Sequence, residues 1–145
     1  MKRAGFTMIE LIFVIVILGI LAAVALPKFI GVADQAHEGK LKSYVGTLNR
    51  TVGPALWSES ISGTTNGSVT TLSSALLLQI DSLSELTADP DLSKCAANAT
   101  PIAANTGTIA SATVGATTYN IGCIDGGLTG APSFFLDDGV NVILQ

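Results

Sequence analysis

One long apolar run dominates the pattern of hydrophobic and polar positions in this chain. It covers residues 6–26, and Glu10 is the single charged residue within it. As an α-helix, a run of this length would rise ~31 Å, which matches the ~30 Å hydrocarbon core of a bilayer. The pattern therefore predicts a membrane-spanning helix. Because a carboxylate is costly in lipid, Glu10 needs a functional explanation.

A second pattern predicts that the helix continues beyond Pro27, over residues 28–58. Five apolar residues step by three or four and form a stripe that would pack on a globular head. They are Leu41, Val45, Leu48, Val52 and Leu56. Pro27 predicts a kink over residues 23–27. Gly53-Pro54 predicts a bend or break shortly before the helix ends near residues 57–59.

Less regular patterns follow the predicted helix. Residues 58–74 are rich in Ser, Thr, Gly and Asn and are expected to form a loop, with a short strand at residues 69–72. Ser73-Ser74 can cap a short helix that ends at Gln79 or Ile80. The leucines of that helix suit a hydrophobic core better than a functional site.

The last third of the chain predicts antiparallel strands. Thr108–Val114 and Thr117–Ile124 have strand character, and Gly115-Ala116 fits a hairpin turn between them. Asp138-Gly139 is a strong signal for a two-residue type I′ turn. In that turn Asp137 would face Val140, Phe135 would face Val142, and Phe134 would face Ile143.

These elements predict an α+β fold, in which a long N-terminal helix packs on a small antiparallel sheet. The first half of the helix would span the membrane and the second half would be amphipathic. The expected organisation is a leader at residues 1–5, a transmembrane helix at 6–27, its amphipathic continuation at 28–58, and a β-rich head at 59–145.

Charge is distributed unevenly over the 145 residues. Residues 1–50 hold six of the seven Lys and Arg residues. Residues 51–145 hold eight of the eleven Asp and Glu residues and a single cation, Lys94. An acidic distal part is unsuited to bind phosphate groups. We therefore expect no direct contact with nucleic acid.

Cys95 and Cys123 are the two cysteines of the chain. They lack CxxC spacing and have no histidine nearby, which disfavours a metal or thioredoxin-like site. A disulfide is the default if the chain is exported, and it would stabilise the fold by ~3 kcal/mol. Two buried free thiols are the alternative. Cys123 would share a strand face with Tyr119 and Ile121.

The polar residues form no recognisable catalytic constellation, so we expect neither an enzyme nor a cofactor. His37 is the only histidine, and a solvent-facing or interface role suits it better than that of a ligand or base. Asp125, Asp137 and Asp138 are weak candidates for a calcium site, because hard oxygens suit that ion. Their spacing matches no known loop, so the turn interpretation of Asp138-Gly139 is favoured.

Three interpretations of the N-terminal segment compete. Residues 23–25 (Ala-Val-Ala) would suit cleavage of an ordinary secretory signal peptide, and a plain membrane anchor would explain the length of the apolar run. Both leave Glu10 without a role. In the third, cleavage between Gly5 and Phe6 frees an ammonium on Phe6. The Glu10 carboxylate of a neighbouring subunit could then neutralise it.

The sequence GFTMIELIFVIVILGILAAVALPKF resembles the N-terminal segment of type IV pilins and of the pseudopilins of type II secretion systems. The resemblance covers roughly the first thirty residues. It implies cleavage after Gly5 by a prepilin peptidase, methylation of the Phe6 nitrogen, subunit docking through Glu10, and a helix bend at Pro27. Pilins also resemble this chain in bracketing a C-terminal region with a disulfide.

The resemblance implies a structural subunit of a type IV pilus-like filament, with a type II secretion pseudopilin as the alternative and a soluble secreted protein as a second one. Its partners would be copies of itself, related pilins, the prepilin peptidase and an inner-membrane assembly platform. The basic leader predicts a cytoplasmic N-terminus and a periplasmic head. The mature chain would then enter a surface pilus or a periplasmic pseudopilus.

Overall fold

The computed structural model describes residues 5–78, 84–97 and 107–144 of the chain. It forms two compact units, Met1–Ala36 and His37–Gln145. Helix α1 (Met8–Thr47) begins in the first unit and ends in the second. The second unit carries the remaining elements and is called the head below. The architecture is α+β, as the sequence predicts.

In the first unit, α1 is a single helix with apolar side chains on all sides. It continues through Pro27, so the proline does not end it. A proline within a helix removes one backbone hydrogen bond. The hydrogen bonds of the neighbouring turns keep the helix continuous. The bend expected over residues 23–27 stays a prediction.

Gly53-Pro54 does not break the helix, and the bend expected there as the alternative stays a prediction. The helix ends at Ser62, so Trp57 and Glu59 lie near its end as the sequence predicts. A π-helical segment, η1 (Leu48–Val52), connects α1 directly to α2 (Gly53–Ser62). The Gly53 N–H donates to the Leu48 carbonyl, five residues back. This wider turn relieves the clash that a proline ring makes with the preceding turn of an α-helix. Pro54 then occupies the first turn of α2, where no N–H is needed.

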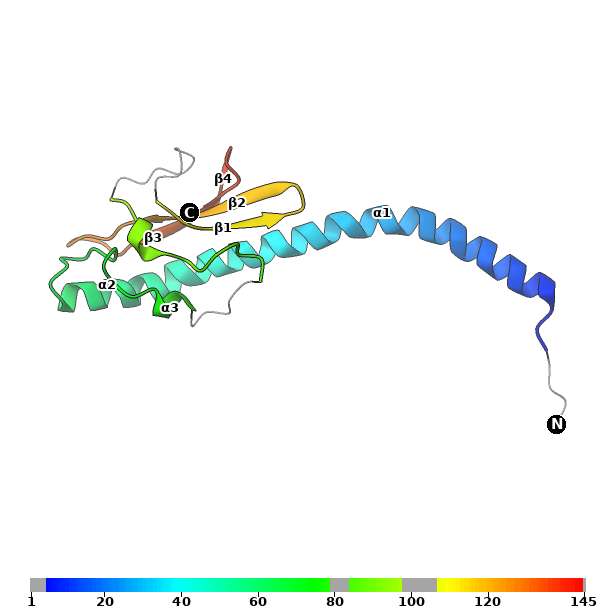
Figure 1. The fold of residues 1–145 in the computed structure, drawn as a ribbon, viewed down its shortest axis with the longest axis horizontal. Helices are drawn as coiled ribbons and strands as arrows, with labels where there is room; N and C mark the ends of the chain where they lie inside the picture. Colours follow the sequence, from blue (N-terminus) through cyan, green and yellow to red (C-terminus); the bar gives the residue numbers. More distant parts are fainter. Residues whose placement is uncertain (1–4, 79–83, 98–106, 145) are drawn as a thin grey trace. The chain divides into compact units, whose positions relative to one another are not determined.

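The predicted apolar stripe is confirmed, because all five of its residues are buried in the head. They pack beneath a four-stranded antiparallel sheet in the order β1-β2-β3-β4 (Figure 1). The strands are β1 (Thr108–Val114), β2 (Thr117–Ile124), β3 (Ser133–Asp137) and β4 (Val142–Leu144). The β1 and β2 strands and the turn between them lie where the sequence predicts. As predicted, Tyr119, Ile121 and Cys123 are buried together in the core.

The turn between β3 and β4 differs from the prediction. Asp137 pairs with Val142, and Leu136 pairs with Leu144, so residues 138–141 form the loop. The φ angle of Gly139 is positive, at 82°. The Asp138 carboxylate accepts hydrogen bonds from the N–H groups of Val140 and Asn141. These bonds stabilise a wider loop than a two-residue turn, and the three predicted cross-strand pairs are therefore wrong.

The remaining described segments between α2 and β1 are short and irregular. Residues 69–72 form turns and bends, so the short strand expected there is wrong. The short helix is confirmed as α3 (Ala75–Leu78), while Gln79 and Ile80 lie outside the described residues. Residues 84–97 include a 3₁₀ turn, η2 (Leu92–Lys94). Residues 86–91 run along the outer side of β1, and Ala96 pairs with Ile124 at the end of β2.

Candidate functional site

Thr7 and Glu10 form a reciprocal pair at the start of α1. The Glu10 Oε2 atom accepts hydrogen bonds from the Thr7 N–H at 2.8 Å and from the Thr7 hydroxyl at 2.7 Å. The Glu10 N–H donates in return to the Thr7 hydroxyl at 3.4 Å. This is a capping box, which satisfies N–H groups at a helix start. The Thr-x-x-Glu spacing is the sequence signature of a capping box, and it was missed among the sequence-based predictions.

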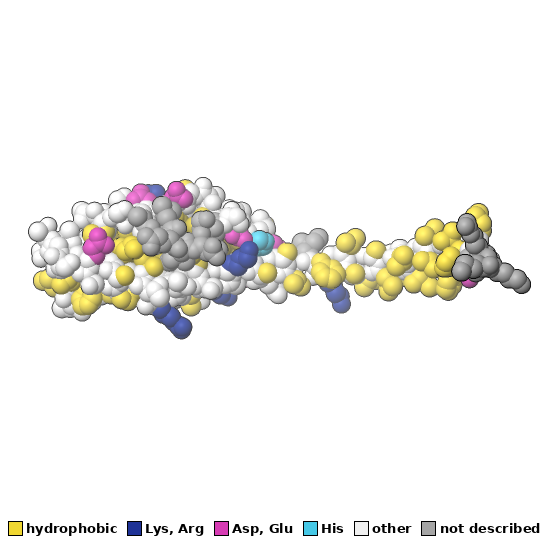
Figure 2. All heavy atoms as spheres, turned by 90° about the horizontal axis from the view of Figure 1, so that it is seen from below, with side chains coloured by type: hydrophobic (Ala, Val, Ile, Leu, Met, Phe, Trp, Pro, Cys, Tyr) yellow, Lys and Arg dark blue, Asp and Glu magenta, His cyan; other side chains and the backbone are white. Residues whose placement is uncertain are grey.

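The residues around this cap present a continuous apolar surface. The Phe6 side chain is 80% exposed, and the apolar side chains that follow it along α1 are exposed as well. Figure 2 shows hydrophobic side chains gathered along this part of the helix. By length and composition, the helix Met8–Ser62 contains one stretch able to cross a membrane, and none of that stretch is buried within the described chain.

Gly5 and Phe6 precede the first turn of α1 in a non-helical segment. No described atom lies within 4 Å of a side chain built at Gly5. Backbone outside a helix is accessible to a protease, since its peptide groups are not engaged in the helical hydrogen bonds. The geometry is therefore compatible with cleavage between these two residues.

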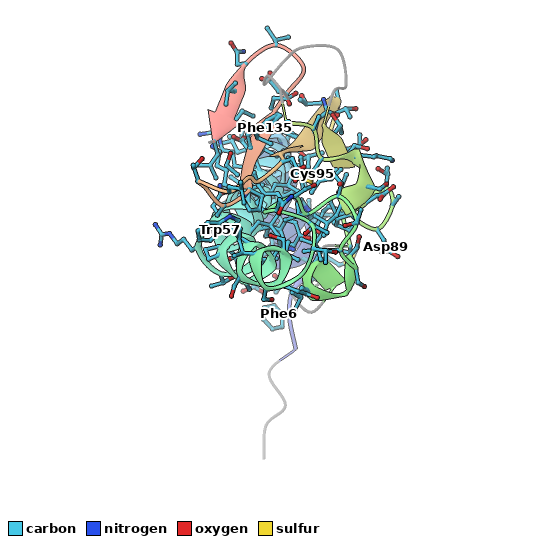
Figure 3. The ribbon with its side chains drawn as sticks, turned by 90° about the vertical axis from the view of Figure 1, so that its left-hand side faces the viewer. Phe6, Trp57, Asp89, Cys95 and Phe135 are labelled. Carbon is cyan, nitrogen blue, oxygen red and sulfur yellow. A yellow bond between two sulfur atoms is a disulfide. The ribbon has the colours of Figure 1, made fainter. Side chains whose placement is uncertain are left out.

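The two cysteines form a disulfide in the head. The Sγ atoms of Cys95 and Cys123 are 1.99 Å apart. Cys123 lies in the centre of the sheet on β2, and Cys95 directly follows η2 (Figure 3). The Ala96 N–H donates to the Cys123 carbonyl beside the bridge. The disulfide and this hydrogen bond hold the segment around residue 96 against the sheet.

The three candidate calcium ligands have separate structural roles. Asp125 accepts hydrogen bonds from the Ser68 hydroxyl and from the N–H groups of Val69 and Gly126, and it anchors a loop. Asp137 is buried and accepts hydrogen bonds from Asn120 and Gly139. The N–H groups of Asn141 and Val140 hold the pKa of Asp138 below its ordinary value. Among the described residues, no three acidic, His or Cys side chains gather as metal ligands.

His37 belongs to an ionic cluster within the head. Its Nδ1 atom lies 2.6 Å from Oε1 of Glu85, and Lys40 Nζ lies 3.1 Å from the same oxygen. Hydrogen bonds from Lys40 and His37 lower the pKa of the Glu85 carboxyl from its ordinary 4.5 to about 2. The Glu85 side chain is 9% exposed. The sequence reasoning missed this cluster, because Glu85 lies 48 residues from His37 and no local pattern joins them.

The matches to known proteins cover a minor part of the chain. A family model described as the prokaryotic N-terminal methylation motif matches residues 1–26. The type IV narrow pilus major component PilA5 of Thermus thermophilus is 51% identical over 41 residues, which cover 28% of this chain. The match spans 35% of that relative, or about a third of its length. No solved structure matches the chain.

These matches agree with the geometry of α1. The chain carries the N-terminal methylation motif and a segment similar to that of a type IV pilin. Its long apolar helix and four-stranded antiparallel sheet form a pilin-like α+β fold. The similarity to type IV pilins is therefore established for a segment of the chain, together with the N-terminal methylation motif.

Proposed function

We propose that this chain is a structural subunit of a type IV pilus-like filament. A prepilin peptidase would cut between Gly5 and Phe6, and the new Phe6 nitrogen would be methylated. The precursor would reside in a bacterial inner membrane, with a cytoplasmic N-terminus and a periplasmic head. An assembly platform in that membrane would then move the mature helix into the filament core. The role is structural, and no step requires catalysis by the chain.

The observation that carries the proposal is an apolar helix that nothing in the described chain covers. Apolar side chains exposed on every side of a helix are stable only in lipid or against other apolar helices. A filament core made of such helices supplies the second environment. The same segment can therefore serve first as a membrane anchor and then as an assembly element.

Glu10 gives the helix a means of docking in a defined register. Thr7 occupies one of its oxygens, Oε2, while no described residue donates a hydrogen bond to Oε1. The ammonium released at Phe6 of a neighbouring subunit would neutralise the carboxylate there. When the carboxylate and the ammonium pair away from water, neither is left as an unpaired charge in an apolar environment.

A surface pilus is favoured over a type II secretion pseudopilus. PilA5 of Thermus thermophilus is a major component of a type IV narrow pilus, and its similarity to this chain supports the same type of filament. The disulfide between Cys95 and Cys123 suits an exported subunit of either filament, because the periplasm is oxidising as well. A pseudopilus would instead serve protein export across the outer membrane.

Intact-mass measurement of filaments sheared from the cell surface tests this function. We expect a chain that begins at Phe6, has lost residues 1–5, and carries one added methyl group. A mature N-terminus at Leu26 would identify an ordinary secreted protein and would overturn the proposal. Deletion of the gene should remove surface filaments and leave protein export unchanged. Loss of export with intact surface filaments would instead identify a pseudopilin.

A further inference from the structure

The head has a groove between its helix and the outer sheet strand β4. Lys42, Gly46 and Arg50 line it on the helical side, and Leu144 lines it from β4; its volume is about 460 Å³. A side chain built at Gly46 would meet no described atom within 4 Å, so the glycine leaves this part of the surface open. The groove is thus an accessible surface with an apolar wall and cationic side chains.

The two cations of this groove differ in their partners. Lys42 forms an ion pair with Glu38 at 2.7 Å on the same helix. Arg50 is exposed, and no carboxylate of the described residues lies within ion-pair distance of it. A planar guanidinium binds a carboxylate through two parallel hydrogen bonds. Arg50 therefore offers an unused binding group for an acidic partner.

The opposite edge of the sheet has a complementary feature. Residues 86–91 run along the outer side of β1, where the Thr87 N–H donates to Ser111 and the Asp91 N–H donates to Ile109. Asp89 lies between these two anchor points and is exposed, with no described cation in ion-pair distance. Figure 3 shows it at the periphery of the head, on the side away from Trp57.

We propose that the groove beside β4 receives residues 87–91 of a second copy of this chain, with Arg50 of one copy paired to Asp89 of the other. The inference rests on the filament role proposed above and names a contact between neighbouring heads. β1 and β4 are the two outer strands of the sheet, so each copy presents one surface of each kind. Contacts between two different surfaces are heterologous, and they build an open helical filament when the rotation between subunits does not close into a ring.

A charge exchange in the full chain, expressed in the native cell, tests this contact. R50E and D89R should each reduce the yield of assembled filaments about tenfold or more, because each places like charges in contact. The double variant R50E/D89R restores the pair and should recover most of the yield. E59R is the matched control, since Glu59 is also an exposed carboxylate outside both surfaces, and its yield should remain unchanged.

Cross-linking supplies a geometric readout that does not depend on yield. In R50K filaments, a carbodiimide should join the new ammonium to Asp89 of a neighbouring subunit, and D89N in the same background should abolish this cross-link. Peptide mass spectrometry of mixed isotope-labelled subunits identifies bonds between copies. Full assembly of R50E, or no recovery in the double variant, would overturn the contact while leaving the filament role intact. Absence of filaments from the unaltered chain would overturn both.

Discussion

At the first turn of α1, the side chains of Thr7 and Glu10 hold each other in place. Both hydrogen bonds to the carboxylate reach the same oxygen, Oε2. The cap therefore orients Glu10 without using its second oxygen. The cap gives the charged residue of an apolar segment a structural role, and the proposed docking would give it a second one.

Substitutions at these two positions should separate capping from docking. Glu10→Ala should leave membrane insertion intact and reduce filament incorporation about 100-fold, because it leaves the Phe6 ammonium unpaired at a cost of ~3 kcal/mol or more. Thr7→Val keeps the carboxylate and loses one capping group, at ~1 kcal/mol. Its incorporation should fall less than tenfold. Quantitative immunoblots of membrane and filament fractions measure both, and equal losses would assign Glu10 to capping alone.

The carboxylate of Glu85 makes the free energy of unfolding depend on pH. Its pKa is lowered from 4.5 to about 2 in the folded chain, so on acidification the unfolded chain takes up the proton first. The stabilisation is therefore complete above about pH 4.5 and is lost as the pH falls to about 2. Denaturant unfolding of the oxidised protein at several pH values should show this decline.

Glu85→Gln is the variant that isolates this effect. It keeps the side-chain shape but removes the charge that His37 and Lys40 contact. Its free energy of unfolding should be lower than that of the unaltered chain at pH 6, and the two values should converge near pH 2. Parallel curves over this range would show that Glu85 does not cause the acid dependence.

Among the elements, η1 is the segment that connects the helix to the sheet. Asn49 within it donates to the Phe134 carbonyl at 2.8 Å and accepts from the Phe134 N–H at 2.7 Å. Phe134 lies on β3 and is fully buried. One side chain thus satisfies both backbone groups of a strand residue. The π-helical turn places this side chain opposite β3 and also accommodates Pro54.

Removal of the Asn49 side-chain amide should lower the free energy of unfolding by more than the loss of a single polar side chain usually does. Asn49→Ala leaves a buried donor and a buried acceptor without partners, and it should lower the free energy of unfolding by ~2–4 kcal/mol. Thr51→Ala is the control, because Thr51 is exposed and its hydroxyl bonds only to the preceding turn. That change should remain within ~0.5 kcal/mol. Chemical denaturation measures both, and similar values for the two variants would contradict the assigned role of Asn49.

For the whole molecule, the disulfide is the covalent link across the head. It joins the segment after η2 to the central strand β2, over a sequence separation of 28 residues. Next to the bridge, the Ala96 N–H donates to the Cys123 carbonyl, and the Ala96 carbonyl accepts from the Asp125 N–H. The disulfide therefore reinforces a contact that the folded chain already makes.

The double variant C95S/C123S should lower the free energy of unfolding by ~3 kcal/mol. Unfolding of the oxidised protein with and without reductant supplies the matching measurement, and the reduced protein should resemble the variant. We expect export and insertion to be unaffected, because the N-terminal helix is unchanged. A variant as stable as the oxidised chain would show that the bridge adds nothing to the folded head.

The sequence by itself determined the elements whose information is local. The apolar run, the stripe that begins at Leu41 and the two strands joined at Gly115 each follow from a period or a turn signal within a few residues. The Thr7 and Glu10 cap belongs to the same class, since its spacing was readable. Local patterns succeed here because the helix forms its hydrogen bonds within itself and the two strands of the hairpin pair with each other.

Only the tertiary structure decided the features that depend on distant partners. Asn49 forms hydrogen bonds with Phe134, 85 residues away, and His37 forms one with Glu85, 48 residues away. The register of β3 against β4 also differs from the one that Asp138-Gly139 predicts, and Asp137, the last residue of β3, is buried and accepts a hydrogen bond from Asn120 on β2. The π-helical segment η1 accommodates Pro54, and the helix continues because the apolar stripe that begins at Leu41 is buried on both sides of η1. Where these groups are buried, an unpaired polar group or a broken core costs more free energy than the departure from local preference.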